Sequence, residues 1–233
     1  LGDVYKRQVI NDQEYQDAAK FTFIYVIISV FVEIILGLFL AFLFNRRIYG
    51  RGFMRSLMIL PIFATPFAIG FMFFTILFEI SGPLAWMGIP FLSNHNWAPF
   101  SVMLVDIWQW TPFCFLVFLA ALQGIPDDLI EAATLDTKSA YKIWTSVILP
   151  LLQPIIVLVI LLRVAESAKL YDYIASLTKG GPGTATQSVS FLVFNKAFKM
   201  NDFGYASAGS FLMLIVVMVF VMLFFTRLRK TYE

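Results

Sequence analysis

Polar and aromatic side chains recur at helical spacing inside two otherwise apolar stretches. At positions i, i+3, i+4 and i+7 the first stretch has Asp106, Gln109, Trp110 and Phe113, and the second has Arg163, Glu166, Ser167 and Leu170. This spacing places each set on one face of a helix. A carboxylate, an amide, a guanidinium and flat aromatic rings on two facing helices are the groups that bind a polyol. We therefore predict a substrate site formed by these eight residues.

Several of these side chains also have a simpler interpretation. Arg163 and Glu166, near the end of their stretch, could pair with each other or extend toward water, and both interpretations of Arg163 stay open. Trp110 and Phe113 could be packing residues, as aromatic side chains on an apolar helix usually are. Asp106 is the leading candidate because it lies nearest the middle of an apolar run, where an ionisable group is costly.

The sequence offers no set of residues for catalysis or for metal binding. Cys114 is the only cysteine and His95 the only histidine, which excludes an intrachain disulfide and a His/Cys metal site. No GxxxxGK[ST] pattern occurs, and the glycines of LTKGGPGTAT lack the Lys-Ser/Thr that completes a phosphate-binding loop. We therefore predict no catalytic residue, no metal and no cofactor in this chain.

The composition places the two polar stretches in a membrane protein. Hydrophobic residues make up 60% of the chain and charged residues 14%, with a mean hydropathy of +0.80. A soluble domain carries about 25% charged residues, so this chain cannot cover itself with polar surface. The formal net charge is only +2, and no basic stripe interleaved with aromatic residues indicates a nucleic-acid partner. The expected surroundings are lipid.

Five apolar runs are long enough to cross the hydrocarbon core as helices, which takes about 20 residues. They are Phe21–Phe44, Leu57–Phe78, Phe100–Leu122, Val147–Ala168 and Ala208–Thr226. Backbone groups in lipid must be satisfied within helices or closed barrels, and these runs are too long and too evenly apolar for barrel strands. The predicted fold class is all-α, a polytopic helical membrane bundle. We expect Pro61 and Pro66 to kink the second run and Glu33, within the first run, to pair with another helix.

Basic residues predict the orientation of the bundle. The connection 45–56 holds four arginines, and the tail holds Arg227, Arg229 and Lys230, whereas the connection 79–99 holds no Lys or Arg. The positive-inside rule therefore places the connection 45–56 and the C-terminal tail in the cytoplasm. Alternation then places the connection 123–146 in the cytoplasm and the visible N-terminus outside. The four lysines between residues 169 and 207 run against the rule, but that connection is longer.

A polar segment interrupts the hydrocarbon before the fourth run. It reads EAATLDTKSAYKIWTSVILPLLQP, residues 131–154. The residues Pro-Asp-Asp that begin at Pro126 favour a helix start, and Ser139 is suited to cap a second helix. We predict two short helices at the cytoplasmic face, with Ala132 and Ala133 small enough for close approach by another surface. Two interfacial helices that rest on lipid headgroups are the alternative.

The order of residues in this segment resembles the EAA motif of ABC importer permeases, with EAATLD followed after a gap by VILPLLQP. Three more stretches resemble that family. They are GLFLAFLFNRRIYGRGFMRSLMILP, residues 37–61; VDIWQWTPFCFLVFLAALQGIPDDLIEAATLD, residues 105–136; and LTKGGPGTATQSVSFLVFNKAF, residues 177–198. The last two resemble the carbohydrate-uptake branch, of the maltose and glycerol-phosphate type. The resemblance implies one ABC importer transmembrane domain over residues 21–230, with a coupling loop at 123–148.

Permeases of this family usually have at least six spans, and five are visible here, so the resemblance implies that the first helix is missing. Residues 1–20 form a polar N-terminal segment. We expect this segment to be truncated and partly non-native, because LGDVYKRQ resembles translated adapter sequence.

The resemblance implies a permease subunit of an ATP-driven, binding-protein-dependent importer in a bacterial inner or plasma membrane. The cargo would be a sugar, an oligosaccharide or a polyol derivative. Two ATP-binding cassette subunits would bind ATP and Mg, a second and related permease chain would complete the pore, and an extracytoplasmic solute-binding protein would deliver the substrate. In maltose-type permeases the substrate contacts come from positions that align with the eight residues named first.

In this family the coupling loop docks into a groove on the ATPase. The residues that the resemblance assigns to docking are Asp128, Glu131, Ala132, Ala133, Leu135, Asp136, Tyr141 and Trp144. The family normally has Gly after the Asp of the motif, where this chain has Thr137. A β-branched residue is strained at positive φ, so we expect the turn to have shifted there.

The resemblance also assigns a role to a glycine-rich turn on the outer face. It consists of Gly180, Gly181, Pro182 and Gly183. The family places this turn beside the docked solute-binding protein. A simple reversal of the chain before the segment Val189–Phe198 is the alternative.

Two other classes of function fit a polytopic helical protein. An ion-coupled secondary transporter that acts without an ATPase predicts inverted repeats and paired broken helices, and the sequence shows no internal repeat. A membrane enzyme requires a metal set, a Ser/His pair or a phosphate loop, and the sequence has no convincing example of any. Only the importer requires a docking helix for a partner, and the sequence has a candidate. We therefore favour the importer.

Overall fold

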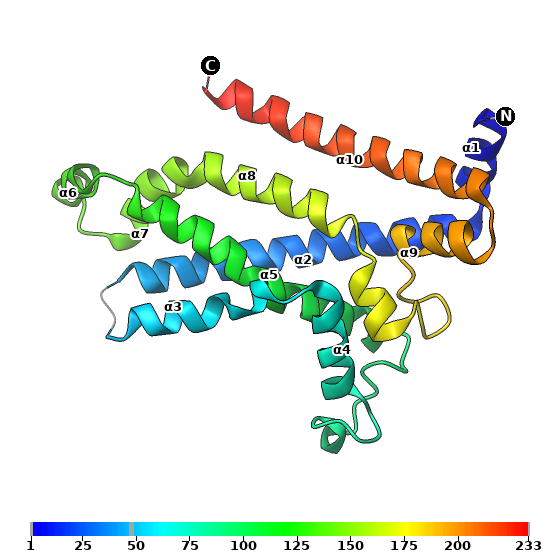
Figure 1. The fold of residues 1–233 in the computed structure, drawn as a ribbon. Helices are drawn as coiled ribbons and strands as arrows, with labels where there is room; N and C mark the ends of the chain where they lie inside the picture. Colours follow the sequence, from blue (N-terminus) through cyan, green and yellow to red (C-terminus); the bar gives the residue numbers. More distant parts are fainter. Residues whose placement is uncertain (1, 47–48, 233) are drawn as a thin grey trace.

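Four long apolar helices form the body of the molecule (Figure 1). The computed structural model describes residues 2–46 and 49–232. Within this part the four helical spans are α2 (Gln13–Asn45), α5 (Trp97–Gln123), the continuous helix Ala140–Ser167 that ends in α8 (Leu149–Ser167), and α10 (Phe203–Tyr232). Each contains one of the predicted runs, so the prediction of an all-α polytopic bundle is confirmed. Arg47 lies outside the described residues, as do the side chains of Arg227, Arg229 and Lys230.

The predicted second run does not form one kinked helix. Helix α3 (Arg51–Ile59) and a 3₁₀ turn, η1 (Leu60–Phe63), are followed after a short break by α4 (Pro66–Leu77), and the two halves meet at 100°. Thr65 starts α4 because its hydroxyl accepts a hydrogen bond from the Ala68 N–H, and Pro66 occupies the first turn. The two prolines therefore coincide with a full break in the helix. The described residues form a fifth span only if the segments on both sides of the break are counted together.

The predicted pair of short helices between the third and fourth runs is confirmed. Helix α6 (Asp127–Asp136) follows Pro126, and α7 (Ala140–Ile143) is capped by Ser139, whose hydroxyl accepts from the Lys142 N–H. A π-helical turn, η3 (Trp144–Ile148), joins α7 to α8. This wider turn lies directly before Pro150, which has no N–H to donate.

The outer end of the molecule is built from shorter pieces. Helix α1 (Gly2–Asn11) packs against the start of α10, together with α9 (Val189–Phe194) and the π-turn η5 (Asn195–Lys199). A second π-turn, η4 (Ile174–Thr178), packs against α4. A short 3₁₀ turn, η2 (Ala85–Met87), lies in the connection after α4.

Figure 1 places α6, α7 and the start of α3 at one end of the bundle and the N-terminus, α9 and the start of α10 at the other. The arginine-rich connection and the predicted coupling loop therefore share one end, as the alternation of spans requires. The structure itself contains no membrane, so the assignment of that end to the cytoplasm stays a prediction.

Two apolar layers of the core enclose a polar one. One layer, around Tyr25, Val102 and Ile174, joins α2, α5 and η4, while the other, around Phe115 and Leu152, joins α2, α5 and α8. Helices α2 and α5 pack closely, since a Cβ added at Gly37 would lie 2.6 Å from the Cβ of Cys114. The buried charged side chains lie between these two layers along the helices.

Candidate functional site

A cavity of about 230 Å³ opens between α5, α8 and the segment that leads into η4. Six of the eight predicted substrate residues line it, namely Asp106, Trp110, Arg163, Glu166, Ser167 and Leu170. The two sets that the sequence predicted on separate helix faces therefore meet in space. Their binding of substrate stays a prediction.

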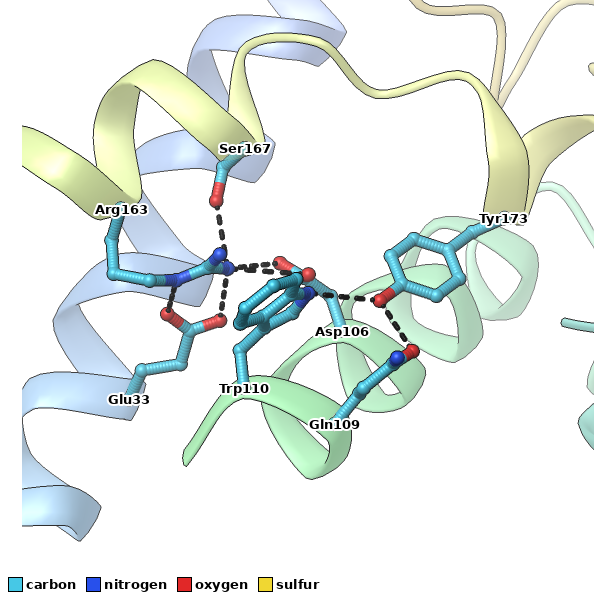
Figure 2. Close-up of polar contacts among 7 residues, drawn as sticks. All are labelled: Glu33, Asp106, Gln109, Trp110, Arg163, Ser167 and Tyr173. Carbon is cyan, nitrogen blue, oxygen red and sulfur yellow. Dashed lines mark hydrogen bonds and ion pairs between the residues drawn. The ribbon is translucent and has the colours of Figure 1, made fainter. Parts of the chain in front are cut away.

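Arg163 is the centre of a buried ion cluster at the inner wall of the cavity (Figure 2). Its Nε donates to Glu33 Oε2 at 2.6 Å, and its Nη2 donates to Glu33 Oε1 at 2.9 Å. Nη2 also lies 3.3 Å from Asp106 Oδ1 and 3.0 Å from Ser167 Oγ. The Glu33–Arg163 pair is bidentate, the geometry in which arginine binds carboxylates most strongly.

This cluster joins three helices, and its charged side chains are almost completely buried. The exposed fractions of Glu33, Asp106 and Arg163 are 0%, 2% and 1%. A charge this deeply buried is tolerated only when it is paired and hydrogen-bonded. The expectation that Glu33 pairs with another helix is confirmed, because its partner belongs to α8. The simpler interpretation of Arg163, that it pairs with Glu166 or extends toward water, is wrong, since the side chain is buried and its bonds go to Glu33, Asp106 and Ser167.

Aromatic residues close one side of the cluster. The Trp110 ring lies 4.6 Å from the guanidinium carbon of Arg163, within the range of a cation–π contact. Trp110 is therefore more than a packing residue. Phe113, in contrast, does not line the cavity. It packs edge-on against Trp110 and lies beside the apolar layer around Phe115 and Leu152.

Gln109 does not line the cavity either, but holds the break before α4 in place. Its Nε2 donates to the Ala64 carbonyl at 2.8 Å, and its Oε1 accepts from the Tyr173 hydroxyl at 2.7 Å. That hydroxyl accepts in turn from Trp110 Nε1 at 3.1 Å. Burial raises the pKa of Tyr173, so its hydroxyl stays protonated and able to donate. Gln109 thus satisfies a carbonyl that the helix break leaves without a helical partner.

Sequence reasoning did not assign Tyr25 to the site. Tyr25 is fully buried and lines the cavity, and its hydroxyl makes no hydrogen bond of normal geometry with the described residues. The hydroxyl does interact with the carboxylate of Asp106, so Tyr25 adds to the polar groups around Asp106 at the cavity wall. Its only sequence signal is its place two helical turns before Glu33, near the face of α2 that turns inward.

At the mouth of the cavity the charges are exposed. Lys169 Nζ donates to Glu166 Oε1 at 2.7 Å, with both side chains more than half exposed. Asp172 lies nearby in the lining and is also exposed. Glu166 is therefore a rim residue and contacts neither Arg163 nor the buried cluster.

The predicted docking residues do not all face the same way. Six of them are exposed: Asp128, Glu131, Ala132, Leu135, Asp136 and Tyr141. Leu135 is 89% exposed and Tyr141 76%, so neither side chain is covered by the described residues of this chain. Ala133 is buried against its own chain. Trp144 packs edge-on against Phe42 of α2, with ring centroids 4.9 Å apart.

The turn after the motif does not use positive φ. Thr137 has φ −151° and ψ 137°, an extended conformation that any residue adopts. A glycine is therefore not required at this position, and α6 ends without backbone strain.

The glycine-rich turn on the outer face is held by its own hydrogen bonds. Thr186 Oγ1 donates to the Gly181 carbonyl at 2.8 Å and lies 2.7 Å from Thr178 Oγ1. Gly180 has φ +88°, and a Cβ there would lie 2.9 Å from a ring carbon of Phe191. The turn therefore requires glycine at this position, and its contact with a binding protein stays a prediction.

A helical bundle with a charged cluster buried between apolar layers, and a polar helix presented at one end, defines a membrane transport subunit. A family model described as "Binding-protein-dependent transport system inner membrane component" matches residues 33–233. The chain belongs to this family. It is therefore a multi-pass plasma-membrane protein of a binding-protein-dependent transport system, and the interpretation as an ion-coupled secondary transporter is set aside.

Curated relatives agree over most of the chain. The trehalose/maltose transport system permease protein MalF of Thermococcus litoralis is 36% identical over 93% of this chain and 76% of its own length. The trehalose transport system permease protein SugA of Mycobacterium tuberculosis is 31% identical over 93% and 72%. The sn-glycerol-3-phosphate transport system permease protein UgpA of Agrobacterium fabrum is 30% identical over 90% and 74%.

A solved structure has the same fold. A chain of a bacterial alginate ABC transporter, in complex with an alginate-bound periplasmic protein, superposes with a TM-score of 0.86. The match covers 97% of this chain and 82% of that one at 21% identity. At this level of identity the likeness concerns the fold alone.

Proposed function

We propose that this permease subunit forms half of the pore through which a sugar, an oligosaccharide or a polyol derivative enters the cell. The observation that carries the proposal is the meeting of six predicted polyol-binding residues in one cavity within a family of import permeases. The named cargo of three relatives supports this class of substrate. Those names include both neutral sugars and an anionic phosphate ester, so they leave the charge of the substrate open.

The cavity supplies complementary groups for a sugar ring. Asp106 accepts from hydroxyls, Arg163 and the Tyr25 hydroxyl donate, and Trp110 gives an apolar surface. Its volume of about 230 Å³ lies below the ~300–1,000 Å³ of ordinary ligand pockets. A second permease chain across the pore would supply the rest of a site for a longer substrate. We propose that this partner is a different, related chain.

We propose that α6 binds a separate ATPase and couples its conformational change to that of the pore. Leu135 and the carboxylates of α6 form an exposed surface at the end opposite the glycine-rich turn. Two ATP-binding cassette subunits, which bind ATP and Mg, would dock on this surface of each permease. Their closure would favour one conformation of the pore, since a ligand shifts an equilibrium only by binding one state better. This chain then needs no catalytic residue of its own.

At the other end, we propose that the turn of residues 180–183 contacts a solute-binding protein. The support is its position at the outer end and its closure by Thr178 and Thr186, which fixes the shape it presents. A rigid turn loses little conformational freedom on binding.

Co-purification of the ATPase tests the proposed coupling surface. The complex would be expressed with a tagged permease carrying Leu135→Asp, and with Ile80→Asp as a matched control at an equally exposed apolar residue in the opposite connection. We expect the ATPase to be lost with Leu135→Asp and kept with Ile80→Asp. Retention of the ATPase by Leu135→Asp would exclude α6 as the docking surface.

A further inference from the structure

The charges around the cavity determine which class of sugar it can accept. Five charged side chains line the cavity. Glu166, Lys169 and Asp172 lie at its mouth, and Asp106 and Arg163 lie inside. Glu33 lies directly behind Arg163 and binds it through both oxygens. Every cation in this set faces a carboxylate, and carboxylates outnumber cations by four to two.

Arg163 cannot act as an anion receptor in this setting. Its Nε and Nη2 groups are committed to Glu33, Asp106 and Ser167. With both carboxylates ionised the buried cluster is negative, and with one proton shared between them it is neutral, so in neither state is it positive. An anionic ligand would have to pass Glu166 and Asp172 and then approach a buried cluster in which two carboxylates face one guanidinium, so it would lose its hydration and gain no net attraction there.

A neutral sugar meets no such barrier. Arg163 Nη1 makes none of the bonds to Glu33, Asp106 or Ser167 and can donate to a hydroxyl oxygen, while Asp106 can accept from a hydroxyl. The buried Tyr25 hydroxyl, which interacts with Asp106 at the cavity wall, adds a further polar group that can bind a sugar hydroxyl.

We propose that this cavity selects uncharged sugars and excludes those that carry a carboxylate, phosphate or sulfate. Glu33 is then a specificity residue, because it neutralises Arg163 without lining the cavity itself. This inference rests on the proposed function, in which the cavity is the substrate site of an importer.

Matched pairs of monosaccharides test the proposal. The probes are the methyl glycosides of glucose, galactose and mannose and the corresponding uronides, in which a carboxylate replaces the C6 hydroxymethyl group. Binding would be measured by equilibrium dialysis on the purified permease–ATPase complex in nanodiscs, with no solute-binding protein added. We expect at least one neutral glycoside to bind, and its uronide to bind at least about tenfold more weakly, because like charges repel strongly where water is scarce.

Variants show which charges are responsible. Glu33→Gln keeps the side-chain shape and removes the negative charge that compensates Arg163. Of the variants, it should therefore reduce the ratio of neutral-glycoside affinity to uronide affinity most. The double variant Glu166→Gln and Asp172→Asn changes only exposed residues. It should reduce this affinity ratio by only about two- to fivefold, since salt screens exposed charges. Asp17→Asn, an exposed carboxylate of α2 outside the cavity, is the control and should change nothing.

Two results would overturn the proposal. One is a uronide that binds the wild-type complex as tightly as its neutral counterpart, and the other is the absence of binding by every neutral glycoside. In either case ATP-driven sugar uptake by the same complex would leave the proposed function standing, and loss of uptake as well would remove both.

Discussion

Arg163 lies between two carboxylates and all three side chains are buried, so its removal leaves a buried negative pair. We expect Arg163→Met to lower the free energy of unfolding by about 3–5 kcal/mol, the usual cost of breaking a buried pair by deleting one partner. Lys169→Met breaks an exposed pair instead and should cost less than about 1 kcal/mol. Unfolding in mixed micelles compares the two variants, and equal losses would contradict the buried cluster.

Glu79 predicts a pH dependence in the outer connection. Partial burial raises its pKa, but hydrogen bonds from Ser93 and from the Leu92 N–H outweigh this and hold the pKa below its ordinary value. Since the folded-state pKa is lowered, the stabilisation is present above the unfolded pKa of about 4.3 and is lost as the pH falls through the folded value.

Hydrogen exchange checks this dependence at two amides. In the wild type, the N–H groups of Leu92 and Ser93 should be protected from exchange near neutral pH and lose this protection at a pH below the ordinary pKa of glutamate. In Glu79→Gln, both amides should be weakly protected at either pH. Protection that is the same in Glu79→Gln and the wild type at neutral pH would show that the carboxylate does not hold this connection.

The sequence predicted the types of polar residue at the site better than their partners. Spacing alone placed Asp106 and Arg163 on inward faces, and the lone charge at Glu33 indicated pairing across helices. Which carboxylate holds Arg163 depends on the relative height of three helices, because Glu33 and Arg163 are 130 residues apart. For the same reason spacing assigned Gln109 to the cavity, although its amide reaches the Ala64 carbonyl instead.

At the level of the helices, the contact of α2 with α5 leaves no room for added volume at Gly37. Gly37→Ala would place a Cβ 2.6 Å from Cys114, and overpacking of this kind costs about 1–3 kcal/mol. Gly52→Ala in α3 meets no atom within 4 Å and should be neutral or stabilising by up to about 1 kcal/mol, since alanine favours a helix. Thermal unfolding of both variants measures the difference, and a stable Gly37→Ala would contradict the close packing of α2 and α5.

The helices themselves were largely predictable, and the break between α3 and α4 was not. Long apolar runs require helices because lipid offers the backbone no hydrogen bonds, and the prolines indicated a kink at the right place. A bend of 100° additionally needs an outside group to satisfy the freed carbonyl at Ala64. That group is Gln109 on α5, a tertiary contact that no local pattern contains.

Gln109 therefore predicts how the two halves of this span are held. We expect Gln109→Leu, which keeps the bulk and removes both hydrogen bonds, to destabilise the protein by about 1–3 kcal/mol, because the Ala64 carbonyl and the Tyr173 hydroxyl lose a partner. Cysteine accessibility at the start of α4 should rise as well. Unchanged accessibility together with unchanged stability would mean that the break is held by other contacts.

In the whole molecule, the substrate cavity and the α6 surface lie toward opposite ends and are joined by continuous helices. Helix α8 carries Arg163 and Ser167 at its outer end and continues without interruption from α7 at the other end. A displacement of α6 and α7 by a docked ATPase would therefore act directly on the buried cluster. This is the mechanical basis of the proposed coupling between ATP hydrolysis and sugar movement.

Sugar uptake into proteoliposomes tests this account most directly. The complete complex would be reconstituted with ATP sealed inside, and a solute-binding protein with radiolabelled maltose or trehalose would be supplied outside. The account predicts uptake that requires internal ATP and is abolished by Leu135→Asp but not by Ile80→Asp. Uptake that proceeds without ATP and follows a sodium or proton gradient would contradict it.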